Sequence, residues 1–413
     1  MTDQPQSRAP RRATVQELRL AAFKSHQGTV LPLAPVTVLH GASGAGKSNA
    51  LDALVALSGL AGGEELEQAL SGVRGGLAGC VPHGRQGFRL GCSVGTPQGT
   101  VRLEVAVRTD GRPRIAAERL ALGRQLLLST GEEARGRISA AWHSDGRQGD
   151  IHAPLSARSL LSAQLPLRVA GANPGERRVL AAVEHLLTAL RELFAVDPVP
   201  ALMRGWVPVS DDARLRGSAE NLAAVIARIQ GECRIRFGRL VQALRAGGAH
   251  PVAGLGVLRD ASGGGERVIT AVDEGGGQWT SAELLGAGTL RRLAFATVLL
   301  TGSGVLQVPS AAEVPDAERL LTVLAEELDP ELCPGLLALA QEVVPRGHIR
   351  LLATARTPAR LPGVLDVRCE RDPATGASLL VPAGPAAAAS APGSAPGSAP
   401  ASAPVSVAPA VAG

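Results

Sequence analysis

Hydrophobic and polar positions along the first part of the chain predict a mixed α/β lobe. Residues 15–20 and 36–39 are strand-like apolar runs, and a helical apolar pattern follows at residues 49–60. From residue 88 to 151, short alternating runs are separated by glycine and aspartate, which is typical of an antiparallel sheet. These patterns predict an N-terminal lobe, residues 1–165, that carries an antiparallel β subdomain.

The middle of the chain shows the helical period instead. Asn173 and Pro174 have the pattern of an N-cap and a first-turn proline, and apolar residues follow at helical spacing as far as Phe194. A second apolar stripe runs from about Ser218 to Leu244. We therefore expect residues 166–262 to form an α-helical insertion.

Strand and helix patterns alternate again in the last third of the chain. The expected elements cover residues 267–272, 282–300, 305–308, 315–328 and 349–353. They predict a C-terminal α/β lobe at residues 263–382. The remaining residues, 383–413, are uncharged and rich in Ala, Pro and Ser, so they are expected to be a disordered tail.

Composition excludes several classes of protein. Five cysteines without a C-x-x-C pair support neither a disulfide framework nor a zinc site, and they fit a reducing cytosol. Residues 1–12 lack the apolar core of a signal peptide, and the longest uncharged apolar stretch, residues 293–308, is too short to cross a bilayer. We expect a soluble, cytoplasmic protein with no membrane span.

The charge of the chain permits a nucleic-acid partner without requiring one. The formal net charge is +5, and eight arginines against four acids lie between Arg204 and Arg245. Because the chain has no Tyr and few other aromatic residues, any such contact should be made to phosphates. The alternative is that these arginines form an ordinary solvated helix surface.

The most specific motif follows the second strand-like run. Residues 41–48 read G-x-x-x-x-G-K-S between a strand and a helix, which is the context of a phosphate-binding loop. Lys47 is expected to reach the β- and γ-phosphates, and Ser48 is the expected Mg²⁺ ligand. Only one other lysine, Lys24, occurs in a chain that otherwise uses arginine, which indicates that an ammonium is needed at position 47. The expected ATP-binding residues are Gly41, Ala42, Ser43, Gly44, Ala45, Gly46, Lys47, Ser48 and Asn49.

With this loop, the chain resembles the RecF/SMC-like ATP-binding proteins, relatives of the ABC-type ATPase heads, over residues 15–382. The strings that carry the resemblance are Phe23-Lys24-Ser25, residues 46–54, Arg74-Gly75-Gly76, Asp197-Pro198 with Met203-Arg204, and residues 220–225. The resemblance implies a P-loop NTPase fold of the ABC/RecF head type, with ATP and Mg²⁺ as cofactors. It also implies an ATP-dependent homodimer and is compatible with a role in DNA repair.

The resemblance places a signature segment at residues 285–291, which would contact the nucleotide of a second subunit. Gly286, Gly288 and Thr289 are the expected contacts in trans. Gly286 stands where the family signature has a serine. Backbone capture of phosphate at a helix N-terminus is still expected there.

Two further family positions are expected to be degenerate. The Walker B strand should end in two acids, one for Mg²⁺ and one for the attacking water, and the prolines at 309 and 315 align Gln307 and Val308 with them. Arg356 stands in place of the switch histidine. We therefore assign no catalytic residue from these alignments and expect ATP binding with weak or absent hydrolysis.

Two alternatives stay open. The protein could be an active ATPase whose carboxylates come from unaligned positions, with Glu313, Asp316 and Glu318 as the nearest candidates. It could also be a P-loop kinase or GTPase, which the lack of an N-K-x-D string disfavours. An ABC transporter subunit has little support from a single chain.

Overall fold

A computed structural model describes residues 12–147, 149–246, 252–262, 265–308, 319–329 and 335–382. The expected tail at residues 383–413 and the three acidic candidates Glu313, Asp316 and Glu318 lie outside these ranges. The described residues belong to one compact unit that ends at Pro382.

The elements follow one another along the chain in an order that mixes strands and helices. The first part contains β1 (Thr14–Phe23), β2 (His26–Pro32), β3 (Val36–His40), α1 (Lys47–Ala61), α2 (Leu66–Ala69), α3 (Gly76–Gly79), β4 (Gly87–Thr96), β5 (Gly99–Arg108), β6 (Arg114–Leu122), β7 (Gln125–Ala134), β8 (Arg137–Trp142) and β9 (Ile151–Ser156). The middle part contains α4 (Leu161–Gln164), the 3-10 helix η1 (Leu165–Leu167), α5 (Pro174–Arg191), β10 (Leu193–Val196), α6 (Pro200–Met203), β11 (Val207–Pro208), α7 (Leu222–Glu232), α8 (Arg234–Arg245) and β12 (Gly254–Asp260). The last part contains β13 (Arg267–Asp273), β14 (Trp279–Ser281), α9 (Ala287–Leu300), β15 (Leu321–Ala325), α10 (Leu336–Val343), the 3-10 helix η3 (Val344–Arg346), β16 (Ile349–Ala355), β17 (Leu365–Arg371) and β18 (Ser378–Pro382).

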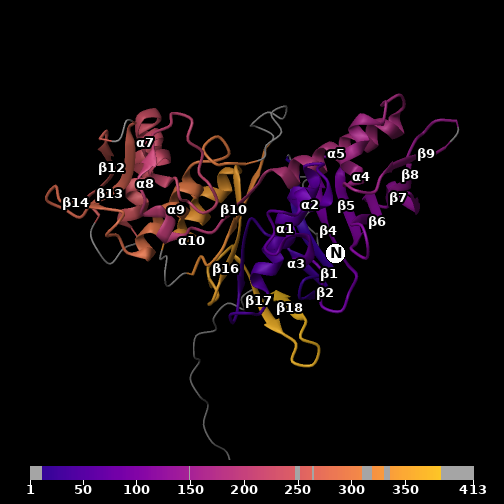
Figure 1. Ribbon diagram of the computed structural model, residues 1–413, viewed down its shortest axis with the longest axis horizontal. Coiled ribbons are helices and arrows are strands. Elements are labelled where there is room, and N and C mark those ends of the chain that lie inside the picture. The colour runs from indigo at the N-terminus through magenta and orange to yellow at the C-terminus, as the bar shows by residue number, and fades with distance from the viewer. Residues whose placement is uncertain are drawn as a thin grey trace, which may run out of the picture. The chain divides into compact units, whose positions relative to one another are not determined.

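Fourteen strands of the described residues form one large sheet, in the order β10-β15-β16-β3-β17-β18-β2-β1-β4-β5-β6-β7-β8-β9. The five strands from β10 to β17 are parallel, whereas β4 to β9 pair antiparallel. Figure 1 shows the indigo-to-magenta strands β4–β9 and the yellow strands β16–β18 that this order joins. Because parallel strands end at one edge of a sheet, the segments after β3, β15 and β16 come together.

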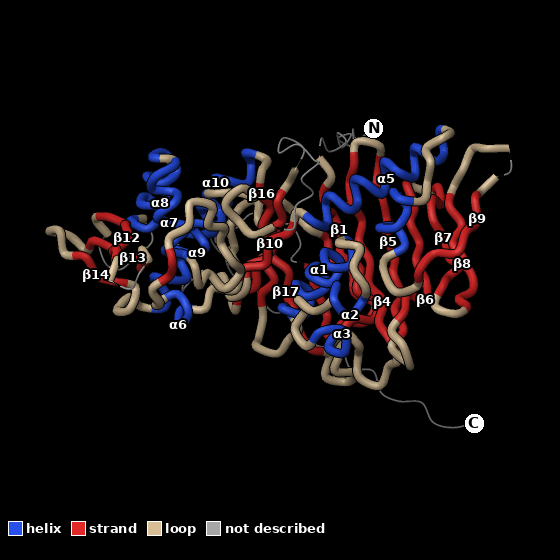
Figure 2. The backbone as a smooth tube through the Cα atoms, turned by 45° about the horizontal axis from the view of Figure 1, so that its top comes forward, coloured by secondary structure: helices blue, strands red, loops and turns tan. Residues whose placement is uncertain are grey.

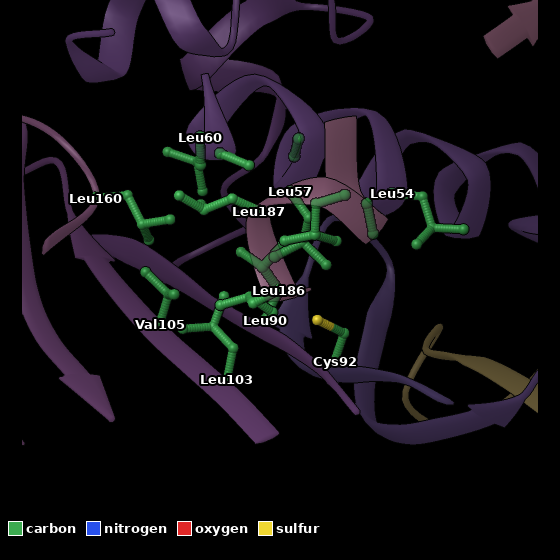
Figure 3. Close-up of a cluster of buried hydrophobic side chains, with 14 of the residues drawn as sticks. Leu54, Leu57, Leu60, Leu90, Cys92, Leu103, Val105, Leu160, Leu186 and Leu187 are labelled. Carbon is green, nitrogen blue, oxygen red and sulfur yellow. The ribbon is translucent and has the colours of Figure 1, made fainter. Parts of the chain in front are cut away.

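Two hydrophobic cores support the sheet. In the first, α1 and α5 pack on one face of the antiparallel strands, and Leu57 and Leu186 lie together with Leu90 and Leu103 there (Figure 3). Figure 2 shows α1 and α5 lying across the strands β1, β4 and β5. In the second core, α7, α9 and α10 pack with β13, β15 and β16. The α/β fold with an antiparallel β subdomain is therefore confirmed.

The helices of residues 166–262 do not form one separate all-α insertion. The N-cap of α5 is as predicted, since the Asn173 side chain accepts a hydrogen bond from Glu176 N. However, α5 belongs to the first core, whereas α7 and α8 pack in the second, and β10 between them joins the large sheet. The long predicted stripe is also two helices, because Cys233 between them has an extended backbone with φ −148° and ψ 94°.

The C-terminal lobe differs from the prediction at two segments. Residues 305–308 are not a strand of the sheet, and Leu306 makes only an isolated bridge with Leu215. The segment expected to be a helix, residues 315–328, instead contains β15, all five residues of which are buried. A strand buried on both faces is a continuous apolar run, which resembles a short buried helix in sequence.

Among the described residues, no helix combines the length and apolar character needed to cross a membrane.

Candidate nucleotide site

The phosphate-binding loop connects β3 to α1, and close contacts require two of its glycines, Gly41 and Gly46. At Gly41, with φ +140°, an added Cβ would lie 2.3 Å from Cys369 O. At Gly46, with φ +107°, it would lie 2.1 Å from Ser378 Oγ. A residue with a side chain would therefore push the loop away from β17 and β18.

Lys47 begins α1 and bends back over the loop. Its ammonium donates hydrogen bonds to Gly41 O at 2.7 Å and to Ala42 O at 2.8 Å. Burial lowers the pKa of Lys47, and the neighbouring Arg356 lowers it further, whereas the nearby Glu326 and Glu327 oppose this shift. The ammonium is thus a half-buried cation that contacts neutral carbonyl groups, which suits it to receive an anion.

Ser48 faces the end of a different strand of the sheet. Its hydroxyl donates a hydrogen bond to Glu326 Oε2 at 2.6 Å, and Thr354 Oγ1 donates to the same oxygen at 3.3 Å. Glu326 follows β15 directly, and Glu327 is the next residue. The Glu327 backbone N–H donates to Thr354 Oγ1 at 2.9 Å. A hydroxyl and a carboxylate oxygen in contact are suitable ligands for Mg²⁺, directly or through water.

An arginine from outside the loop also reaches this carboxylate. Arg74 NH2 lies 2.9 Å from Asp52 Oδ2 and 3.5 Å from Glu326 Oε1. Asp52 is buried and also accepts from Lys24 Nζ at 2.8 Å, and Lys24 in turn donates to Arg74 O at 2.8 Å. Three strings that the sequence analysis took from different places, around Lys24, Asp52 and Arg74, are therefore one charged cluster beside the loop.

These groups surround a cavity of about 360 Å³. Six of the nine predicted loop residues line it, namely Ser43, Gly44, Gly46, Lys47, Ser48 and Asn49. Gly41, Ala42 and Ala45 contribute carbonyl oxygens to hydrogen bonds around the loop. Arg74, Arg356 and Arg371 line the same cavity together with the acids Glu327 and Asp329, so with Lys47 its lining has four basic and two acidic side chains. Such a cavity is suited to a polyphosphate.

Arg356 lies where the resemblance puts the switch residue. It follows β16 directly, and its backbone N–H donates to Asp329 Oδ2 at 3.4 Å. Its guanidinium cannot exchange a proton near neutral pH, so a role for it at the site is electrostatic.

Gln307 and Val308 are not brought to the loop. Instead, they line a separate hollow with Leu193, Phe194 and Gly217. The Gln307 N–H donates to Leu215 O at 3.0 Å. The alignment that put these two residues at the Walker B positions is therefore corrected, because the strand that ends beside Ser48 is β15.

The segment expected to act in trans lies at the start of α9. Gly286 is the N-cap of this helix, and Gly286 and Gly288 are exposed. Arg291, one turn further along, pairs with Glu327 at 2.8 Å. The first turn of α9 therefore presents free backbone N–H groups to solvent near the second acid after β15.

Sequence reasoning missed Glu326 and Glu327. Their signal was present as the apolar run of residues 320–325 followed by two glutamates. The pair was hidden because the run was taken as part of a helix, on which charged residues are common.

The comparisons with known proteins found structures but no sequence family. No family model and no curated protein matches the chain. Among solved structures, it is similar to an SMC head bound to the C-winged helix domain of ScpA, with a TM-score of 0.49 and 11% identity over 90% of this chain and 98% of that one. It is also similar to the SMC head domain from Thermotoga maritima, with a TM-score of 0.43 and 12% identity over 90% of this chain and 99% of that one. A third similar structure is the recombination mediator protein RecF with ATP, with a TM-score of 0.38 and 10% identity over 92% of this chain and 100% of that one. SMC heads and RecF are the group that the sequence motifs resemble.

Proposed function

We propose that this protein binds ATP with Mg²⁺ and hydrolyses it as an ABC-type ATPase head. The observation that carries the proposal is the 2.6 Å hydrogen bond between Ser48 Oγ and Glu326 Oε2. It joins the Mg²⁺-ligand position of the phosphate loop to a carboxylate at the end of a neighbouring parallel strand. This is the relationship that the Walker B acid should have to the loop, and the alignment with Gln307 did not supply it.

The residues around the cavity fit a nucleotide triphosphate. Gly41 and Gly46 lie so close to β17 and β18 that only backbone fits there, and Lys47 is a half-buried cation beside them. Lys47, Arg74 and Arg356 would bind the phosphates, and Ser48 with Glu326 would hold Mg²⁺. Bound Mg²⁺ would supply a Lewis acid that polarises the phosphate oxygens.

Glu327 is the proposed group for the attacking water. Its side chain is 63% exposed, lines the cavity and pairs with Arg291, so it is an ionised carboxylate that water at the cavity can reach. This assignment favours the active-ATPase alternative over binding without turnover. The family switch histidine is still replaced by Arg356, so proton exchange at that position is not part of the proposal.

The first experiment measures ATP affinity by titration of the purified full chain. Wild type is expected to bind Mg-ATP, and Lys47→Ala is expected to lose about tenfold or more in affinity because a charge-assisted contact is removed. Equal affinity of the two proteins would reject the nucleotide site.

The second experiment measures phosphate release at saturating Mg-ATP. Glu327→Gln should keep ATP bound but slow turnover by about 10²–10⁴-fold, as expected for loss of a catalytic base. Gln307→Ala is the matched control and should leave turnover unchanged. A wild type with negligible turnover, or a Gln307→Ala variant that is as slow as Glu327→Gln, would return the protein to the binding-only alternative.

The proposal also includes ATP-dependent homodimerisation. It is supported by the exposed glycines at the N-terminus of α9, since a phosphate of a second subunit would find free N–H groups there. We also propose that the protein works in the cytoplasm. DNA repair is the process in which we propose that it acts.

A further inference from the structure

The rear of the phosphate loop is attached to the C-terminal hairpin β17–β18. Ser378 Oγ donates to Ala45 O at 2.6 Å, and Cys369 Sγ donates to the same oxygen at 3.3 Å. The next carbonyl along the loop, Gly46 O, accepts from His26 Nε2 at 3.0 Å. Ser378 and His26 are neighbours in the sheet, where β18 pairs with β2, and both are fully buried.

The hydroxyl groups behind the loop form a chain with a defined direction. Asn49 Nδ2 donates to Ser25 Oγ at 2.7 Å, and Ser25 Oγ lies 2.7 Å from Ser378 Oγ. Because Ala45 O can only accept, Ser378 gives its one proton to that carbonyl, and Ser25 must therefore donate to Ser378. This series of hydrogen bonds starts at Asn49 in the first turn of α1, passes through Ser25 and Ser378, and ends at Ala45 O. It therefore links the start of α1 to the loop through β18.

Fixing these carbonyls fixes the amides that would hold phosphate. In a trans peptide, the N–H of one residue points opposite to the C=O of the residue before it. Holding Ala45 O and Gly46 O toward β18 and β2 therefore turns the N–H groups of Gly46 and Lys47 away from the hairpin, toward the cavity. Without these donors, the loop peptides could rotate and the N–H groups would lose their common direction.

We infer that Ser378 and His26 are positioning residues that set the affinity of the phosphate loop for the phosphates of a nucleotide. The inference rests on the proposed function, and it adds that the C-terminal hairpin, more than 300 residues from the loop in sequence, controls phosphate binding. Neither side chain touches the ligand. They act through the orientation of two loop peptides.

The test compares ATP affinity and thermal stability in four full-length proteins. Wild type and Lys47→Ala first establish whether the nucleotide site exists. Ser378→Ala should then weaken ATP binding about five- to tenfold, because one buried hydrogen bond that orders the loop is lost. Ser93→Ala is the matched control, since Ser93 is a buried strand serine that bonds Glu17 at 3.2 Å, and it should leave ATP affinity unchanged.

A double-mutant cycle separates a positioning role from general loss of stability. Ser25→Ala alone should weaken ATP binding less than Ser378→Ala, because Ser378 can still donate to Ala45 O. In the Ser378→Ala background, Ser25→Ala should add little, since the chain is already broken. Additive losses that simply follow the melting temperatures would overturn the inference.

Two outcomes keep the inference separate from the proposed function. If wild type does not bind ATP, both fail. If wild type binds and Lys47→Ala does not, but folded Ser378→Ala binds like wild type, only the positioning role is overturned. Should Ser378→Ala not fold, Ser378→Cys replaces it, because a thiol is a weaker donor of similar size, and unchanged affinity in that variant would also overturn the inference.

Discussion

Ser48 Oγ lies 2.6 Å from Glu326 Oε2, although the two residues are 278 positions apart in the chain. The contact arises because one strand, β16, lies between β3 and β15 in the parallel part of the sheet. The loop after β3 and the acids after β15 therefore end at the same edge. Because of this contact, we assign the proposed Mg²⁺-holding acid to Glu326 and not to the position of Gln307.

Ser48→Ala should make ATP binding nearly independent of Mg²⁺. The variant removes the hydroxyl that contacts Glu326 but keeps Lys47 and the loop amides. Affinity for ATP in the presence of Mg²⁺ should fall about tenfold, whereas affinity in the presence of a chelator should be unchanged. Titration with and without Mg²⁺ measures this. Ser58→Ala, at a buried serine further along α1, is the control, and an equal loss in that variant would indicate a fold defect instead.

The loop and its two flanking elements could be predicted from sequence because their signals are local. The G-x-x-x-x-G-K-S octet, the apolar run before it and the helix after it all lie within 25 residues, and the structure has them as β3 and α1. Asn173 was likewise predicted because an N-cap contacts a residue three positions away.

The acids at the end of β15 also have a local pattern, an apolar run followed by two glutamates, but that pattern alone does not place them at the loop. Their assignment depends on which strand lies beside β16, and that is a property of sheet order rather than of neighbouring residues. The rear contacts from Ser378 to the loop have no sequence signature at all, since a serine near the end of the chain carries no indication of its partner. The roles of Gly286, Gly288 and Thr289 in trans stay predictions.

Gly288→Asp should prevent ATP-dependent dimerisation without unfolding the monomer. Gly288 is exposed in the first turn of α9, where an acidic side chain is favourable to the helix but would repel a phosphate held by a second subunit. Light scattering with and without Mg-ATP should show a mass increase for wild type and none for the variant. ATP titration of the variant is the control, because it shows whether the phosphate loop of the same subunit still binds ATP. If the molecular mass of wild type is the same with and without Mg-ATP, the dimerisation proposal is wrong.

Charge reversal on α8 tests for a nucleic-acid partner. Arg234 and Arg239 are exposed, and neither has an ion pair among the described residues. If they contact phosphates, duplex binding should fall steeply with salt, and Arg234→Glu with Arg239→Glu should lower the slope of log affinity against log salt by about 2. Reversal of Arg259, which pairs with Glu266, is a matched control on another surface. Absence of duplex binding at low salt would leave the α8 arginines as a solvated surface.

His26 should make the protein less stable as the solution becomes acidic. Because Gly46 O can only accept, His26 Nε2 carries the proton, and its buried Nδ1 has no hydrogen-bond partner in the described part of the chain. Burial lowers the pKa of His26, and Arg371 lowers it further, against the opposing effect of the bond to Gly46. The folded state therefore keeps His26 neutral at pH values where the His26 side chain of the unfolded chain, with a pKa of about 6.5, takes up a proton.

Below about pH 6.5 the unfolded state binds more protons than the folded state. The free energy of unfolding therefore decreases as the pH is lowered, by up to about 1.4 kcal/mol per pH unit. Above that pH the stabilising contribution of neutral His26 is fully present.

Denaturant unfolding from pH 8 to 5 measures this pH dependence. His26→Gln is the comparison, because a Gln amide can donate to Gly46 O but does not titrate. The difference in unfolding free energy between the two proteins should stay constant above pH 7 and shift against wild type below pH 6.5, and a difference that does not depend on pH would show that His26 is protonated equally in both states.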